Sequence, residues 1–100
     1  MIDFERIEGF EWDEGNHRKS EDRHGVTQAE AEQAFMNEPL IVAADAPHSV
    51  AESRLYALGR SHGGRRLHVA FTLRQDGTRI RVISARDMSR KERKVYEDHG

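Results

Sequence analysis

Hydrophobic and polar positions alternate most clearly between residues 52 and 86. From residue 66 to residue 74, every odd position is a large apolar residue and every even position is polar or small. This period of two is typical of a strand with one buried face. Glycine-containing segments lie on both sides of the run, at residues 61–64 and at Asp76-Gly77, and both favour hairpin turns. The pattern therefore predicts a three-stranded antiparallel meander with an apolar face and an open, basic face.

The third strand of this meander, at residues 79–85, follows the same alternation less strictly. Ile80 and Val82 fall on the core face, and Arg79 and Arg81 fall on the open face. Ile83 has the parity of the open face and so does not fit. We expect Arg79 and Arg81 to lie beside His68 across neighbouring strands.

Capping signals predict three helices around the sheet. Residues 13–24 follow an N-cap at Asp13 and end at Gly25, although this segment has no apolar stripe. Thr27 and Glu30 form a capping box for a second helix, which reaches about Met36 and turns Ala31, Ala34 and Phe35 inward. A further capping box at residues 89–92 begins a C-terminal helix that has few apolar contacts: Met88, Val95 and Tyr96.

Two apolar segments add strands to this scheme. Residues 10–12 alternate as a short strand, whereas residues 1–9 have no clear period and are expected to form a loosely ordered tail or an added edge. Residues 40–44 are continuously apolar and predict a strand that is central or covered at its edge.

Composition limits the class of protein. The 100 residues predict one domain, 1–100, with a single thin core, since 36% are hydrophobic and 34% are charged. The chain has no cysteine, which excludes disulfides and thiolate metal sites. It has no apolar run near the ~20 residues of a membrane span and no visible signal peptide, so we expect a cytoplasmic protein without a membrane partner.

The net charge of −2 hides two halves of opposite sign. Residues 1–50 carry 4 Lys/Arg and 12 Asp/Glu, a net of −8, and residues 51–100 carry 12 and 6, a net of +6. Nearly all the basic residues of the second half are arginines, whose planar fork matches phosphate or carboxylate oxygens. The acidic half either neutralises this surface or leaves it for a nucleic-acid or acidic partner.

Five short motifs occur in order along the chain. They are Phe10-Glu11-Trp12-Asp13, Arg23-His24-Gly25-Val26, Arg54 with Gly59 five residues later, Ile83-Ser84-Ala85-Arg86, and Glu92-Arg93 with Tyr96. Over about residues 10–97 the chain thereby resembles the BrnT toxins. This resemblance implies a ribonuclease toxin of a type II toxin–antitoxin system with a RelE-like fold. Its partner would be a BrnA-like antitoxin that carries a DNA-binding domain, and one assembly to expect is a heterotetramer with that antitoxin.

The resemblance also implies a fold class. We expect an α+β protein with a mainly antiparallel sheet of about four strands, a short N-terminal strand, two N-terminal helices and one C-terminal helix. The sequence departs from the family pattern where Asn16 and Ser20 replace a usual Lys and Asn, and where Arg23 replaces a usual Lys. Arg23 keeps the positive charge but does not transfer a proton at neutral pH.

Metal-free RNA cleavage needs a base for the 2′-hydroxyl, cations for the phosphate and an acid for the leaving 5′-oxygen. Arg54, Arg81 and Arg86 are expected to converge on one phosphate. His24, His68 and Tyr96 are the candidates for proton transfer, and Trp12 and Tyr56 are candidates for base stacking, although Trp12 also suits the core. The predicted catalytic residues are Arg23, His24, Arg54 and Arg86, and the predicted RNA-binding residues are Trp12, Tyr56, His68, Arg79, Arg81 and Tyr96. No metal or other cofactor is expected.

The sequence therefore predicts a small metal-independent endoribonuclease toxin. One alternative is a non-catalytic domain that keeps the fold and binds a protein, and another is a regulatory RNA- or DNA-binding module. We expect an acidic antitoxin segment to lie between the C-terminal helix and the open sheet face, where it would cover the arginines and compete with RNA.

Overall fold

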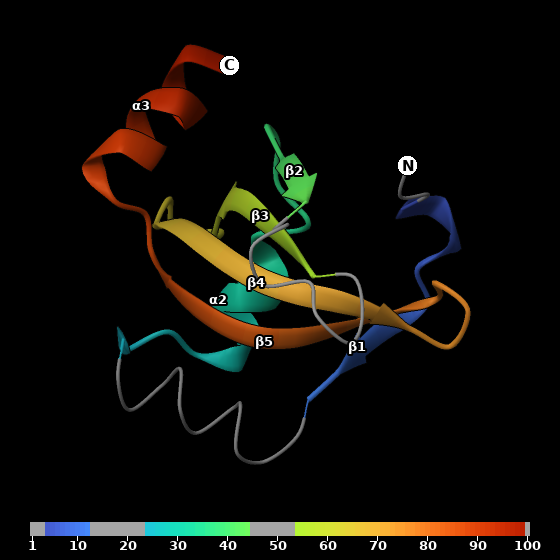
Figure 1. The fold of residues 1–100 in the computed structure, drawn as a ribbon. Coiled ribbons are helices and arrows are strands. Elements are labelled where there is room, and N and C mark those ends of the chain that lie inside the picture. The colour runs from blue at the N-terminus through green and yellow to red at the C-terminus, as the bar shows by residue number, and fades with distance from the viewer. Residues whose placement is uncertain (1–3, 13–23, 45–53, 100) are drawn as a thin grey trace.

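The computed structural model describes residues 4–12, 24–44 and 54–99, which form one sheet with helices on its two faces (Figure 1). The sheet has the spatial order β1-β5-β4-β3-β2. Its strands are β1 (Gly9–Glu11), β2 (Ile41–Ala44), β3 (Leu55–Arg60), β4 (Arg66–Arg74) and β5 (Arg79–Asp87). The helical elements of the described residues are a 3-10 turn η1 (Phe4–Arg6), α2 (Gln28–Gln33) and α3 (Arg90–His99). No helix among these residues is long and apolar enough to cross a membrane.

The predicted fold class was wrong in its sheet and in its helices. The short N-terminal strand is part of the sheet: β1 pairs in parallel with β5, with Phe10 opposite Ile80, and the sheet is therefore five-stranded and mixed. Within the described residues only one α-helix, α2, precedes the meander, and the first predicted helix lies outside them except for His24. A three-residue apolar alternation predicts a strand but contains no information about which strand it joins or in which direction.

The meander and its turns follow the prediction. β3, β4 and β5 pair in antiparallel order, and turns at residues 62–63 and 75–78 connect them. β5 contains an irregularity, because Ala70 lies opposite Ser84 whereas Phe71 lies opposite Val82. Ile83 is thus an extra residue, a β-bulge, which explains its exceptional parity. The bulge places Arg86, like Arg81, on the face opposite the main core.

Helix α2 closes the main core. Its capping box forms as predicted, since Thr27 Oγ1 accepts from the Glu30 N–H and Glu30 Oε1 accepts from the Thr27 N–H, both at 3.1 Å. Ala31 and Ala34 are fully buried. The helix lies so close to β3 that a Cβ on Gly59 would come within 2.3 Å of the Ala34 carbonyl oxygen. Gly59 is therefore required for the packing of α2 on the sheet.

The other face of the sheet is less open than the alternation predicted. Tyr96 of α3 packs with Leu58 and Met88 in a second, smaller apolar cluster between the helix and the sheet. The Tyr96 hydroxyl donates to the Pro39 carbonyl at 2.7 Å. Farther along this face Thr72 is 2% exposed. The predicted contact of Val95 was wrong, because this side chain is 50% exposed. The space between α3 and the sheet, where an antitoxin segment was expected, is occupied by these side chains at the Tyr96 end.

Candidate active site

Three of the predicted residues come together on the face that carries α3. His68 of β4 and Arg86 of β5 are direct cross-strand partners. The ring of Tyr56, from β3, stacks on the imidazole of His68 with centroids 5.1 Å apart and planes 12° apart. The stacked ring limits the rotation of the His68 side chain, of which 15% is exposed. The sheet thus presents an oriented histidine beside an arginine.

A carboxylate that sequence reasoning did not select completes this group. Glu92, from the first turn of α3, accepts two hydrogen bonds from Arg86, with Nη1–Oε1 at 2.8 Å and Nη2–Oε2 at 3.0 Å. Its Oε1 also accepts from the Ser89 N–H at 2.8 Å, as part of the predicted capping box. The hydrogen bonds from Arg86 are the largest cause that lowers the pKa of Glu92 to about 2, although burial opposes them. Glu92 is therefore ionised at neutral pH.

Glu92 also lies near the histidine. Its Oε2 is 3.9 Å from Nε2 of His68, so the two groups form an ion pair whenever the imidazole is protonated. The one feature of the sequence that could have indicated a functional role for Glu92 is its place in the last of the five motifs, Glu92-Arg93 with Tyr96. A capping role accounts for a glutamate at this position, and only the bulge in β5 brings Arg86 within its reach.

The other predicted cations lie farther along the sheet. Arg81 is the cross-strand partner of Thr72, four residues from His68 on β4, which corresponds to about 13 Å along the strand. Arg54 directly precedes β3 at the same end of the sheet, because the next residue, Leu55, pairs with Phe71. Arg54 and Arg81 therefore form a group of cations separate from Arg86.

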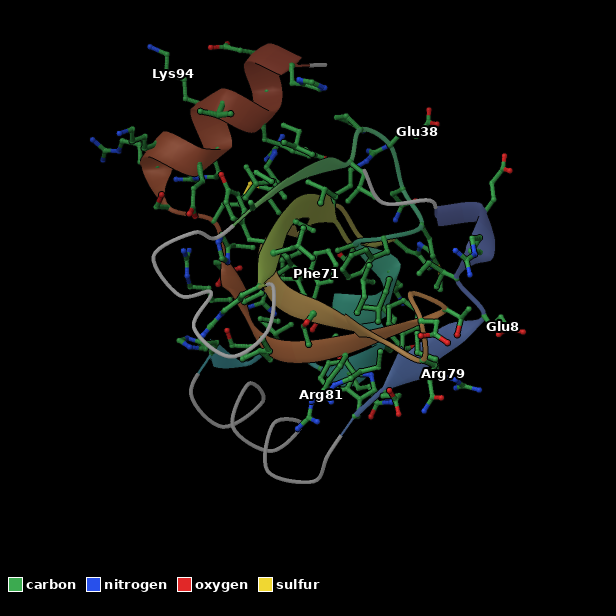
Figure 2. All side chains as sticks on the ribbon, turned by 45° about the vertical axis from the view of Figure 1, so that its right-hand side comes forward. Glu8, Glu38, Phe71, Arg79, Arg81 and Lys94 are labelled. Atoms are coloured by element: carbon green, nitrogen blue, oxygen red, sulfur yellow. The ribbon has the colours of Figure 1, made fainter. Side chains whose placement is uncertain are left out.

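Figure 2 shows Arg79 and Arg81 at the end of the sheet far from Lys94 of α3. A surface hollow at this end is lined by Glu11, Trp12, Arg74, Gln75, Asp76 and Arg81. Its lining combines two arginines with two carboxylates, Glu11 and Asp76, so the formal charges of this hollow balance.

Two residues predicted to contact RNA have structural contacts. The Trp12 Nε1–H donates to Glu32 Oε2 of α2 at 2.9 Å, and the indole packs against the main core. Tyr96 is 4% exposed and anchors α3. RNA contacts by Trp12 and Tyr96 stay predictions.

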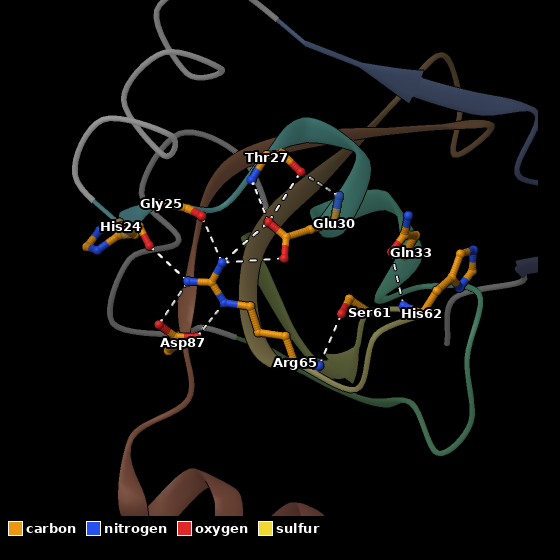
Figure 3. Close-up of polar contacts among 9 residues, drawn as sticks. All are labelled: His24, Gly25, Thr27, Glu30, Gln33, Ser61, His62, Arg65 and Asp87. Atoms are coloured by element: carbon orange, nitrogen blue, oxygen red, sulfur yellow. Dashed lines mark hydrogen bonds and ion pairs between the residues drawn. The ribbon is translucent and has the colours of Figure 1, made fainter.

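A second polar cluster, centred on Arg65, was not predicted (Figure 3). Arg65 donates to both carboxylate oxygens of Asp87, at 2.7 and 3.0 Å, and to the carbonyls of Gly25 at 2.7 Å and His24 at 3.0 Å. Its Nη1 also approaches Glu30 at 3.3 Å. The hydrogen bonds from Arg65 are the main reason why the pKa of Asp87 lies below its usual value, against the effect of burial. Arg65 therefore fixes the segment around His24 against the end of β5.

This cluster separates His24 from the group around His68. Asp87 pairs with Leu67 on the face of the main core, whereas Arg86 pairs with His68 on the opposite face. The His24 imidazole is exposed and points away from Arg65 in Figure 3. Arg23, Asn16 and Ser20 lie outside the described residues. Among the residues that are described, no three His, Asp or Glu side chains form a group that could hold a metal ion.

The fold and this site define a small α+β protein with an arginine–histidine centre suited to an anionic ligand. Residues 12–92 match the family model described as "Ribonuclease toxin, BrnT, of type II toxin-antitoxin system". The chain belongs to this family. It is therefore a toxin of a toxin–antitoxin system, and the family implies an antitoxin partner.

Among solved structures, the chain is similar to the Brucella abortus ribonuclease toxin BrnT, determined at 1.1 Å resolution. The sequence identity is 25%, the TM-score is 0.60, and the match covers 82% of this chain and 97% of the other. No curated protein sequence matches the chain.

Proposed function

We propose that the protein is a metal-independent endoribonuclease whose reaction takes place at the α3 face of the sheet. The observation that carries the proposal is the arrangement of His68: it is stacked on Tyr56, paired across the strands with Arg86, and 3.9 Å from a carboxylate. A titratable imidazole can transfer a proton, a fixed guanidinium can stabilise the charge of a phosphate, and a carboxylate can stabilise the protonated imidazole.

The chemistry follows from these groups. His68 takes the proton of the 2′-hydroxyl, and the 2′-oxygen attacks the adjacent phosphorus while the bond to the 5′-oxygen breaks. The products are a 2′,3′-cyclic phosphate and a 5′-hydroxyl. Arg86 stabilises the charge on the phosphate oxygens in the transition state. The imidazolium so formed donates a proton to the leaving 5′-oxygen, which gives the 5′-hydroxyl and restores the neutral imidazole.

Glu92 supports this reaction without accepting the proton itself. With a pKa of about 2 it is too weak a base to deprotonate a hydroxyl at neutral pH. Its charge instead stabilises the imidazolium that His68 becomes, and its two hydrogen bonds hold Arg86. The remaining arginines, Arg54, Arg79 and Arg81, bind flanking phosphates of the RNA, which predicts affinity that falls with salt.

We further propose that the antitoxin is BrnA-like and binds through an acidic segment to the arginines of this face, in the cytoplasm where the RNA substrate is present. Toxin and antitoxin could then assemble as a heterotetramer. Because the segment and RNA require the same cations, each should weaken binding of the other. A stable ternary complex with unchanged RNA affinity would place the antitoxin elsewhere.

The test of the catalytic proposal is RNA cleavage by the purified protein in chelator and in magnesium. We expect equal rates under both conditions, and a loss of at least about a hundredfold in His68→Ala, as for removal of a general base. His99→Ala, which removes an exposed histidine at the end of α3, is the matched control and should retain the wild-type rate. Activity that vanishes in chelator and returns with magnesium would contradict the metal-free reaction. Salt-dependent RNA binding without any cleavage would favour the non-catalytic alternative.

A further inference from the structure

The guanidinium of Arg86 has two edges that can each bind an anion. Its end edge, formed by Nη1 and Nη2, is taken by the two oxygens of Glu92. The second hydrogen of Nη1 is taken by the carbonyl of Asp87 at 3.0 Å. A guanidinium carries five N–H donors, so the Nε–H and the second Nη2–H remain. Among the described residues neither of them has a contact, and they point in parallel from one side edge.

This geometry decides between two roles for Glu92. If Glu92 occupied the position of the phosphate, RNA would have to displace a carboxylate that is also bonded to the Ser89 N–H at the start of α3. If the phosphate binds the side edge, Glu92 keeps its hydrogen bonds to Arg86 and to the Ser89 N–H. The Arg86 side chain is 39% exposed, so part of it is open to a ligand. Two parallel N–H groups match two phosphate oxygens in the same way as the end edge matches the carboxylate.

We propose that Glu92 is a positioning residue that holds Arg86 by its end edge, so that the Nε and Nη2 edge binds the phosphate of RNA. This inference rests on the proposed ribonuclease function and deepens it. Glu92 thereby increases the affinity for phosphate, although its charge is negative, because it removes the rotational freedom that Arg86 would otherwise lose when the ligand binds. The position of His68 opposite Arg86 places the bound phosphate next to the imidazole.

Three variants separate this role from a structural one. Glu92→Gln keeps an acceptor for the Ser89 N–H but offers Arg86 a neutral amide with a single acceptor atom, so Nη1 and Nη2 can no longer each bond to an oxygen of their own. Arg86→Lys keeps the charge but has no second edge. Ser89→Ala is the control, because it removes the bond from the Glu92 N–H to Ser89 Oγ and leaves the pair of Glu92 with Arg86 in place. Any general effect of a weaker α3 should appear in Ser89→Ala as well.

The readout is the nitrogen-15 NMR signal of the Arg86 Nε–H during titration with inorganic phosphate, followed by the affinity for a 2′-O-methyl RNA oligonucleotide that cannot be cleaved. In the wild-type protein we expect the Nε–H signal to shift with phosphate. We expect the affinity of Glu92→Gln and Arg86→Lys for the oligonucleotide to fall about tenfold, the effect of one charge-assisted hydrogen bond, and that of Ser89→Ala to stay within about twofold.

The inference is overturned if Glu92→Gln binds phosphate or the oligonucleotide more tightly than the wild type, since Glu92 would then be a competitor. It is also overturned if the wild-type protein cleaves RNA while the Nε–H signal stays unchanged, an outcome that leaves the proposed function standing. A shifted Nε–H signal in a protein that does not cleave RNA would support the side edge as an anion site and remove the ribonuclease function instead.

Discussion

Replacing Arg65 by alanine should be among the most destabilising surface substitutions in this protein. The change removes the hydrogen bonds to the carbonyls of His24 and Gly25 and the bidentate pair with Asp87, and it leaves Glu30 without its cation. These contacts join two segments about 40 residues apart in sequence to the end of β5.

The magnitude can be worked from the geometry. Two bonds from a charged donor to backbone carbonyls contribute about 1 kcal/mol each at a partly exposed site. The pair with Asp87 adds at most about 1 kcal/mol, because the Asp87 side chain is 61% exposed and solvent screens it. The expected loss is therefore about 2 to 3 kcal/mol, which lowers the melting temperature of a domain of this size by roughly 10 to 20 °C.

Urea denaturation at neutral pH, followed by circular dichroism, measures this loss. Arg66→Ala is the matched control: the neighbouring arginine is 43% exposed and makes a surface ion pair with Glu97 at 3.0 Å, so it should cost about 0.5 kcal/mol. Arg65→Lys should recover less than half of the loss, since one ammonium group cannot reach Asp87 and both carbonyls. If Arg65→Ala costs no more than Arg66→Ala, the cluster does not hold the segment around His24, and the reasoning is refuted.

Three further predictions concern the other site and the helix contact. Hydrogen bonds, first those from Arg86 and then that from the Ser89 N–H, lower the pKa of Glu92 from 4.5 to about 2 in the folded state. They therefore stabilise the protein above pH 4.5, and this contribution is lost as the pH falls toward 2. After allowance for the 39% exposure of Arg86, urea denaturation of Glu92→Gln should show a deficit of about 1 to 2 kcal/mol at pH 7 that shrinks below pH 4.5; a deficit independent of pH would contradict the ion pair. Arg86→Ala should reduce RNA cleavage at least about a hundredfold and lower stability by about 1 kcal/mol, and unaltered cleavage would exclude Arg86 from the site. Gly59→Ala should lower the free energy of unfolding by about 2 kcal/mol or more, because the added Cβ would clash with the Ala34 carbonyl. Gly63→Ala is the control and should cost much less, since its Cβ would lie 3.9 Å from the nearest side-chain atom. Equal losses in urea denaturation would mean that α2 can shift away from β3.

The structure changes the stability that we expect for Arg86→Ala. In the sequence Arg86 directly follows the predicted strand at residues 79–85, and this position predicts a solvated cation whose removal leaves the melting temperature nearly unchanged. The structure instead pairs Arg86 with Glu92 at 2.8 and 3.0 Å. Removing it leaves a partly buried carboxylate without its counter-charge, which costs free energy even at a surface site.

Local features were predictable because a few neighbouring residues determine them. The capping boxes at Thr27 and Ser89 and the turn at Asp76-Gly77 each depend on residues within four positions of one another. Gly25 has a φ of 65°, the left-handed conformation that was predicted for it.

Features that join distant segments were not predictable from one sequence. Nothing in residues 9–11 indicates that β1 lies in parallel beside β5, and nothing in the alternation of β5 distinguishes a bulge at Ile83 from an irregular face. Arg65 was overlooked because its partners lie 22 to 41 residues away and a charged residue after a turn is normally solvated.

The candidate site shows the same division. Alternation alone correctly placed His68 on the face opposite the apolar residues of β4, but the extent of cover by α3 depended on where the helix docks. The sequence predicts Glu92 as a capping residue of the C-terminal helix. Its pairing with Arg86 could not be predicted, because it depends on the bulge that turns Arg86 toward α3.

The central claim is that His68 and Arg86 catalyse attack by the RNA's own 2′-hydroxyl. It is tested most directly by the chemistry of the cut ends. RNA is cleaved by the purified protein in chelator, and the fragments are analysed by mass spectrometry. The account predicts fragments that end in a 2′,3′-cyclic phosphate and begin with a 5′-hydroxyl, and no cleavage at a linkage whose 2′-hydroxyl is replaced by hydrogen. Fragments with a 5′-phosphate and a 3′-hydroxyl, or cleavage of the 2′-deoxy linkage, would contradict it.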